Sequence, residues 1–414
     1  MSPPNNHFMP PILLDWSELL IRWLHVVVGI AWIGSSFYFV HLDLSLKQRP
    51  GLPDKAFGDA WQVHGGGFYH MVKYLVAPAE MPDELTWFKW EAYATWFSGM
   101  ALLAVLYYLG AELYLIDTHV LALAPWQAIL ISLAGLVAGW AIYDGLCRSP
   151  LGRDDRTLLG VGFVFLVAAA YIFTRLFSPR GAFMEIGALI GTMMVANVLM
   201  VIIPGQRKVV KALLAGETPD PIHGKRGKQR SLHNNYLTLP VVFVMIGNHY
   251  PFAYATRWSF LVLALVIVIG VLLRHFYNTR HKGLPSPWWT WGASAACVVV
   301  AIWLSTRGPA YGAKVEVPAA KVAAAVDSAA KNRDDAYNVI AGRCSMCHAA
   351  EPSWPGVHFA PKGVVMETPG QIEALAPRIA SAAVWSNAMP PGNITEIEDG
   401  ERATLAAWLK DKGL

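Results

Sequence analysis

The sequence predicts a mainly α protein, in which an eight-helix transmembrane bundle is followed by a small all-α domain. Two observations lead to this prediction. Of the 414 residues, 55% are hydrophobic and only 15% are charged, with a mean hydropathy of +0.37. The apolar residues gather in long runs up to residue 305, and a hydrocarbon core of about 30 Å needs about 20 helical residues to cross it.

Eight apolar runs are expected to cross the membrane. The sixth is the weakest, because Pro240 and Asn248 interrupt it, although proline is tolerated where neighbours satisfy the freed backbone groups. The motifs Gly135-x-x-x-Gly139 and Gly187-x-x-x-Gly191 are expected to pack helices closely. The expected spans are 17–41, 88–111, 125–146, 157–177, 182–203, 236–252, 257–275 and 287–305.

The distribution of Lys and Arg predicts the orientation of the chain. With the N-terminus outside, the inner loops carry 18 of these residues and the outer loops carry 3, as the positive-inside rule requires. Eight crossings then return the C-terminus to the periplasmic face of a bacterial plasma membrane. No cleavable signal peptide is expected in residues 1–16, which lack a basic region. The basic stretch 206–230 is expected to be a cytoplasmic loop, so no nucleic-acid partner is expected.

The chain is expected to divide into a membrane domain (1–305), a periplasmic tether (306–333) and a C-terminal domain (334–414). The tether is rich in Ala, Lys, Val and Pro. Helices are expected over 334–342 and 395–412, and Tyr337 and Trp408 should meet where these helices cross.

The C-terminal domain contains the run Cys344 to His348, which reads C-S-M-C-H. C-x-x-C-H is the attachment signature of c-type haem. Thiols at the positions of Cys344 and Cys347 can both bond to one haem, and His348 then lies beneath the iron as an axial ligand. Zinc is the alternative, but no second pair of neighbouring cysteines exists to complete a four-ligand site.

Met389 is the expected second axial ligand of the haem iron. It lies in an Asn-Ala-Met-Pro-Pro run that resembles the distal loop of class I c-type cytochromes, and methionine ligation raises the haem potential. His358 and Met366 are the rival ligands. The carbonyl group that fixes the imidazole ring is expected from one of two prolines, Pro355 or Pro361.

His25 lies within the first expected membrane helix, where an ionisable residue is a functional candidate. Gly29 and Trp32 follow on the same helix face, and the glycine leaves room for a flat macrocycle. His249 lies at a similar expected depth, so the two histidines could hold a haem b. Alternatively, His25 simply hydrogen-bonds a neighbouring helix.

The segment from Trp61 to Tyr74 carries three consecutive glycines between two histidines. Glycines let backbone N–H groups approach a ligand closely. His64, His70 and Lys73 could therefore bind a planar anion and move its protons. A flexible turn before an amphipathic interfacial segment is the equally weighted alternative.

Nearly the whole chain resembles the bacterial membrane-bound urate hydroxylases, in which an eight-helix urate oxidase N-terminal domain is fused to a c-type cytochrome. The resemblance lies in the first helix (Leu24 to Gly34), the His64 to Tyr69 segment, the Pro204 to Gln206 run and the haem motif. It implies that urate is oxidised to 5-hydroxyisourate, with water as the oxygen source. Electrons would pass through the cytochrome to a terminal oxidase or a soluble cytochrome.

This reaction needs a base and groups that hold an anionic purine. Asp144 is instead expected to pair with a nearby Lys or Arg. The competing functions are electron transfer from quinol to the cytochrome without a purine substrate, and solute transport with the cytochrome as a sensor. The catalytic candidates are His64, His70, Lys73 and Glu91, with His233 and Gln206 also near the inner face, and Arg22, Glu112, Arg175 and Glu185 near the outer face.

Overall fold

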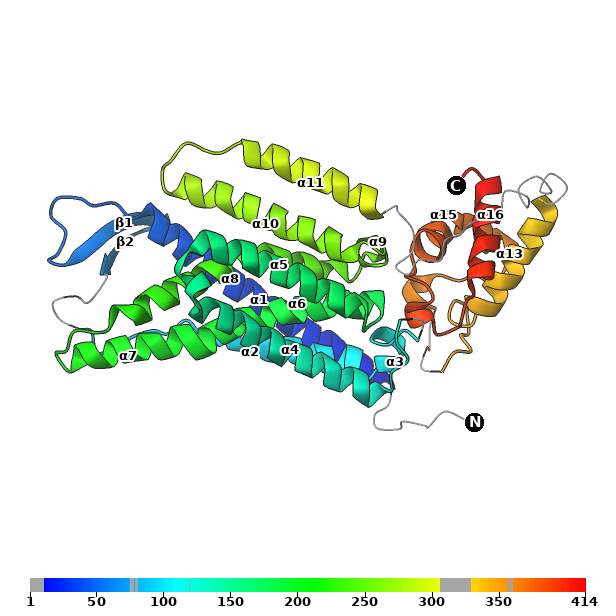
Figure 1. The fold of residues 1–414 in the computed structure, drawn as a ribbon, viewed down its shortest axis with the longest axis horizontal. Helices are drawn as coiled ribbons and strands as arrows, with labels where there is room; N and C mark the ends of the chain where they lie inside the picture. The colour runs from blue at the N-terminus through cyan, green and yellow to red at the C-terminus, as the bar shows by residue number, and fades with distance from the viewer. Residues whose placement is uncertain are drawn as a thin grey trace.

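The computed structural model describes residues 11–74, 78, 81–118, 120–305, 329–355, 357 and 360–414. The chain is mainly helical, as predicted. Long helices lie side by side, with a β-hairpin at one end and a small helical domain at the other (Figure 1). We call these the hairpin end and the docking end of the bundle. The expected tether falls largely at 306–328, outside the described residues.

The bundle consists of long helices joined by short turns and two π-helical segments. The π-helices are η1 (Ala104–Tyr108), which continues α2, and η3 (Asn197–Ile202), which joins α6 to α7. The α-helices are α1 (Pro11–Ser45), α2 (Trp90–Leu103), α3 (Ala111–Tyr114), α4 (Pro125–Arg148), α5 (Asp155–Thr174), α6 (Pro179–Ala196), α7 (Ile203–Leu214), α8 (Pro221–Gly247), α9 (Pro251–Tyr254), α10 (Ser259–His281) and α11 (Trp289–Ser305).

Within the described residues, five helical stretches are long and apolar enough to cross a membrane. They are Trp16–Ser45, Pro179–Leu214 and the helices α4, α5 and α10. Helix α11 is apolar but shorter, with 17 residues. The length and composition of these helices are compatible with a membrane protein. The prediction of eight crossings stays a prediction, because α2 and α8 fall outside this set.

Close helix contacts surround α6, whose side chains are among the most buried of the bundle. A Cβ atom on Gly139 would lie 2.2 Å from Leu189 of α6, and one on Gly187 would lie 2.7 Å from Val244 of α8. The predicted packing role of these glycines is confirmed. It is wrong for Gly191, which faces open space.

The segment before α2 forms an antiparallel β-hairpin of β1 (Ala56–His64) and β2 (Gly67–Tyr74). Gly65 and Gly66 have φ angles of +57° and +81°. Two successive positive φ angles are those of a type I′ turn, which suits the twist of paired strands. The hairpin therefore replaces the helical or flexible segment expected there.

The C-terminal domain packs its first and last helices across each other. The rings of Tyr337 and Trp408 meet at 6.0 Å, as predicted. Glu373 accepts hydrogen bonds from Lys412 and Tyr337, which hold the pKa of its carboxyl below the usual range. The helices are α13 (Ala329–Arg343), α14 (Pro369–Ala374), α15 (Ala376–Ile379) and α16 (Asp399–Asp411), with the π-helix η6 (Ala380–Val384) and the 3₁₀ turn η7 (Pro391–Asn393).

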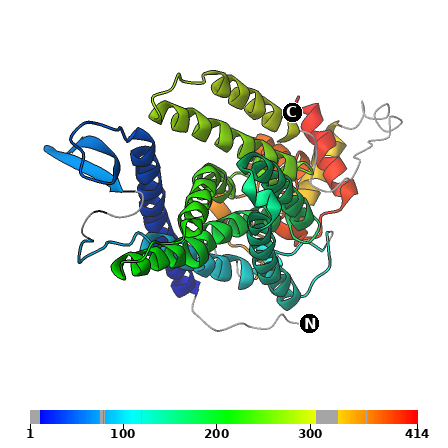
Figure 2. The ribbon, with the colours of Figure 1, turned by 60° about the vertical axis from the view of Figure 1, so that its left-hand side comes forward.

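This domain contacts the docking end of the bundle, as Figures 1 and 2 both show. The amide of Asn387 donates to the carbonyl oxygen of Ala255, over 3.3 Å. Ala388 is 8% exposed and packs with the bundle core. At Gly392, an added Cβ would lie only 2.5 Å from the carbonyl oxygen of Ile116. Residues 387–392 thus form the contact, which we call the docking segment.

Candidate functional site

The C-x-x-C-H motif forms a tight turn directly after α13. The amides of Cys347 and His348 both donate to the carbonyl oxygen of Cys344, over 3.1 and 2.9 Å. Both cysteines are free thiols. Burial raises the pKa of the Cys344 thiol to about 12. The turn therefore brings two thiols and an imidazole into one short stretch of chain.

The ring of His348 is held by a carbonyl group from the next loop. Nδ1 lies 2.9 Å from the carbonyl oxygen of Val364. The expectation that Pro355 or Pro361 supplies this carbonyl is therefore wrong. When Nδ1–H donates to a carbonyl oxygen, Nε2 is the nitrogen left with a lone pair for a metal.

The backbone at Met389 is fixed by two elements of the C-terminal domain. Its amide donates to the carbonyl oxygen of Ala382 over 2.9 Å. Its carbonyl oxygen accepts from Nη1 of Arg402 over 3.1 Å, and the same nitrogen donates to Ala383. Arg402 is 6% exposed, and burial lowers the pKa of its guanidinium.

The residues of this region fit a covalently attached haem. A haem iron takes only two axial ligands from a protein. This region provides the two thiols of the C-x-x-C-H motif for attachment, and the His348 imidazole with a free Nε2 and the Met389 thioether as ligands. Of the rival ligands, Met366 is buried in the domain core, and His358 lies outside the described residues. In the part of the chain that is described, no cluster of three or more His, Cys, Asp and Glu side chains could hold a free metal ion.

A polar network lies inside the docking end of the bundle. Asn248 Oδ1 accepts hydrogen bonds from the Tyr107 hydroxyl over 2.9 Å and from Arg180 Nε over 2.8 Å. The guanidinium of Arg180 lies over the ring of Tyr114, 4.4 Å from its centroid. A cation on an aromatic face is stabilised by the ring quadrupole.

A second chain of hydrogen bonds runs deeper into the same end of the bundle. The hydroxyl oxygens of Tyr108 and Ser132 lie 2.7 Å apart, and Ser132 donates to Glu185 Oε1 over 2.7 Å. Glu185 is fully buried, and its Oε2 has no partner among the described residues. The sequence indicates Glu185 as a candidate, but Tyr108 and Ser132 are not apparent from it, because such residues commonly pack helices.

Two of the predicted catalytic residues on the hairpin contact carboxylates. His70 lies 2.8 Å from Asp59 and stacks on Trp61 at 4.3 Å between ring centroids. Lys73 donates to Asp43 of α1 over 2.6 Å. The first contact joins the two strands of the hairpin, and the second joins the hairpin to α1.

The other two predicted catalytic residues lie apart from these pairs. His64 is exposed at the tip of β1, and Glu91 is partly exposed in the first turn of α2. The structure does not join the four residues in one hydrogen-bonded cluster within the described chain. Their catalytic role stays a prediction.

The remaining sequence candidates are dispersed. Arg22 pairs with Glu18 along α1, and His233 Nδ1 lies 2.7 Å from the Tyr143 hydroxyl. Three further candidates are exposed side chains, namely Gln206, Glu112 and Arg175.

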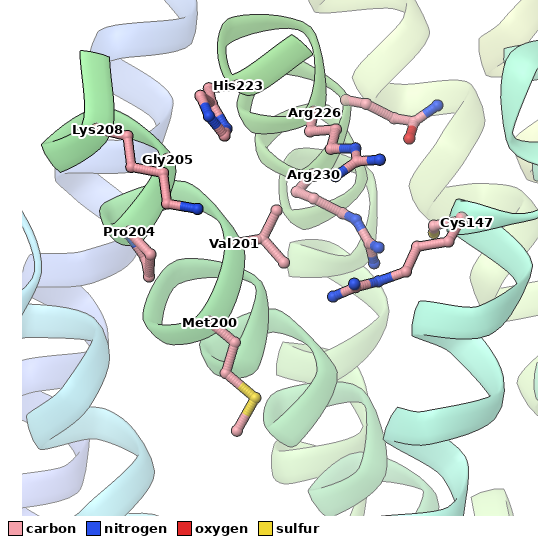
Figure 3. A pocket seen from close by; sticks show the side chains of 11 residues that line it. Cys147, Met200, Val201, Pro204, Gly205, Lys208, His223, Arg226 and Arg230 are labelled. Carbon is pink, nitrogen blue, oxygen red and sulfur yellow. The ribbon is translucent and has the colours of Figure 1, made fainter. Parts of the chain in front are cut away.

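A basic cavity of about 210 Å³ lies between α4, η3, α7 and α8 (Figure 3). Arg230 is 3% exposed and donates to Asp144 over 2.6 Å, so the expected pairing of Asp144 is confirmed. Lys208 and Arg226 make no ion pair with any described residue, so the cavity suits an anion. It is lined by Cys147, Arg148, Met200, Val201, Pro204, Gly205, Lys208, His223, Arg226, Gln229 and Arg230.

His25 contacts α2. Its Nδ1 lies 3.1 Å from the carbonyl oxygen of Thr95 and 3.0 Å from the hydroxyl of Ser98. A Cβ on Gly99 would lie 3.0 Å from the imidazole ring. His25 thus hydrogen-bonds a neighbouring helix, which is one of the two roles that the sequence indicated for it. His249 is exposed in the turn after α8, and a role of either residue in binding haem b stays a prediction.

The fold and site define a class, a helical protein with membrane-type helices and a C-terminal domain docked on one end of the bundle. The model of a family described as urate oxidase N-terminal matches residues 11–305, which is more than half of the chain. The chain therefore belongs to the urate oxidase N-terminal family, and this membership indicates a urate-related oxidoreductase. No curated protein and no solved structure matches the chain.

Proposed function

We propose that the chain is a membrane-bound enzyme that oxidises urate to 5-hydroxyisourate and passes the electrons to its own C-terminal domain, a c-type cytochrome. The family match over residues 11–305 is the observation that carries this proposal. A terminal oxidase or a soluble cytochrome would then take the electrons onward.

The stoichiometry of the reaction sets what the protein must provide. Urate and one water give 5-hydroxyisourate, two protons and two electrons. The protein therefore needs one exit for electrons and another for protons, besides groups that hold the purine anion.

The C-terminal domain supports an electron exit. Cys344 and Cys347 would hold the haem covalently, with His348 and Met389 as axial ligands. A haem at this position would supply one-electron acceptance. Met389 lies in the docking segment, whose backbone contacts Ala255 and Ile116 of the bundle.

We place the docking end at the periplasmic face of a bacterial plasma membrane, with eight helices crossing it. The excess of Lys and Arg in the expected inner loops supports this orientation. In addition, α1 begins at the docking end, where the C-terminal domain also lies (Figure 1).

The distance between the oxidation site and the C-terminal domain decides whether a second electron carrier is needed. Helix α4 has 24 residues, which corresponds to a length of about 36 Å between the two ends. A site at the hairpin end would need an intermediate electron carrier such as a haem b between His25 and His249. A b-type band in a pyridine haemochrome spectrum would support that carrier, and its absence would remove it.

The function is tested by mixing the oxidised protein with urate without oxygen and following its visible spectrum. We expect the haem to be reduced and 5-hydroxyisourate to form, in a ratio of one 5-hydroxyisourate molecule for every two electrons transferred. Reduction by a quinol but not by urate would contradict the proposal and indicate a quinol-linked electron-transfer protein. Peroxide formed in proportion to urate consumed in air would indicate oxygen as the acceptor.

A further inference from the structure

Glu185 carries a buried carboxyl group in the docking half of the bundle, and one of its oxygens has no partner among the described residues. It is fully buried in α6, in a stretch apolar enough to cross a membrane. Its only hydrogen bond within the described chain comes from Ser132, and no cation pairs with it. A carboxylate without a cation is strongly disfavoured in such surroundings, so the neutral acid is the stable form. Ionisable groups retained at this cost in membrane helices usually serve transport or proton transfer.

The hydrogen bonds that reach Glu185 have a direction. A serine hydroxyl has one hydrogen, and Ser132 uses it on Glu185 Oε1. The hydroxyl of Tyr108 must therefore be the donor to Ser132 across their 2.7 Å contact. The order of donation is Tyr108 to Ser132 to Glu185.

A neutral carboxylic acid can pass a proton on through its two oxygens. If Oε1 receives a proton from Ser132, the proton on Oε2 can leave to a water molecule. Ser132 then takes a proton from Tyr108, and Tyr108 takes one from the substrate side. One proton enters for each proton that leaves, and no group in the chain changes its oxidation state.

The π-helical backbone at Tyr108 separates this path from the hydrogen bonds between Tyr107, Asn248 and Arg180. Tyr107 and Tyr108 are consecutive residues at the end of the π-helix η1, and they join two separate sets of partners. π-Helical turns within helices occur frequently at functional sites. Tyr108 is half-buried, whereas Ser132 and Glu185 are fully buried, so the path leads from the edge of the bundle inward.

We propose that Tyr108, Ser132 and Glu185 form a proton-transfer path that carries protons released during substrate oxidation away from the substrate. This inference rests on the proposed function, because urate oxidation is the source of the protons. The path lies at the docking end, so protons and electrons would leave by the same half of the bundle.

The test uses Glu185→Gln in the full-length, haem-loaded protein. A glutamine can still accept from Ser132, so the fold is kept, but an amide does not relay a proton. We expect urate-driven haem reduction and proton release, followed with a pH indicator dye, to slow by about 100-fold, at the low end of the effect of proton-transfer groups. Reduction by an electrode should keep its wild-type rate. Tyr108→Phe should slow the urate reaction similarly.

Glu217→Gln is the matched control, because Glu217 is an exposed carboxylate between α7 and α8 and is not one of the catalytic candidates. It should behave as the wild type. A Glu185→Gln protein that reduces its haem with urate at the wild-type rate would overturn the path.

Infrared difference spectroscopy separates this inference from the proposed function. On electrode-driven reduction, the wild-type protein should show a carboxylic acid C=O band that Glu185→Gln removes. If urate fails to reduce the wild-type protein, the proposed function is wrong, and this spectrum still decides whether Glu185 responds to the redox state. Identical spectra in the two proteins would overturn the inference.

Discussion

Gly392 lies so close to the bundle that adding one methyl group, as in Gly392→Ala, should push the two domains apart. Gly392 has a φ of +55°, and a Cβ at this position would lie 2.5 Å from the carbonyl oxygen of Ile116. Ordinary contact begins at 3.4 Å, so the domains would have to move apart by about 0.9 Å. The contact is with backbone, which cannot rotate away as a side chain can.

The expected size of the effect follows from two costs. A non-glycine residue in the left-handed region costs roughly 1–2 kcal/mol. Overpacking of a well-packed contact costs roughly 1–3 kcal/mol more. Gly363→Ala carries only the first cost, because Gly363 has a φ of +65° with open space around it. The difference between the variants corresponds to weakening of docking by about 5- to 150-fold.

Hydrogen exchange at the Asn387 amide measures this weakening directly, since that amide donates to Ala255 across the contact. Gly392→Ala should accelerate its exchange and slow urate-driven haem reduction, without changing reduction by dithionite. Gly363→Ala should leave both unchanged. Equal exchange in the two variants would show that the docking contact is not the one described.

Three further predictions concern other regions. Replacing Cys344 and Cys347 by Ala should leave a protein without covalent haem, which a haem stain of a denaturing gel would detect; a stained band would exclude these thiols. Asp144→Asn leaves the buried Arg230 guanidinium without a carboxylate and should destabilise the bundle by about 3–5 kcal/mol, whereas unchanged unfolding in detergent would contradict this. The hydrogen-bonded Glu373 carboxylate should stabilise the C-terminal domain at any pH above the ordinary pKa of Glu, and this stabilisation should be lost as the pH falls through the lowered pKa of Glu373. Glu373→Gln should make the melting temperature less sensitive to acid.

Local patterns in the sequence predict much of this molecule. The contact of Tyr337 with Trp408 followed from placing one helix before the C-x-x-C-H motif and a closing helix at the end of the domain. The pairing of Asp144 followed from the cost of a charge among apolar helices. The hairpin was missed, although two glycines between runs of aromatic and β-branched residues are a recognised hairpin signal. In this case three consecutive glycines suggested flexibility.

Contacts between distant segments could not be predicted in this way. The carbonyl group beside His348 belongs to Val364, which has no distinctive side chain, and any residue at that position could supply it. Likewise, Ser132 is an ordinary small residue of an apolar helix until the fold places it between Tyr108 and Glu185. Such pairings depend on the tertiary structure alone.

The docking segment contacts the bundle largely through main-chain atoms and small side chains, and this has a consequence for how the two domains exchange partners. Covalent linkage raises the effective concentration of the C-terminal domain at the bundle above that of a free partner. A weak contact therefore suffices to keep the domain in place for most of the time. A weak contact would also give rapid release, so under the proposed function the same surface would alternate between the bundle and a diffusing redox partner without a dedicated conformational switch.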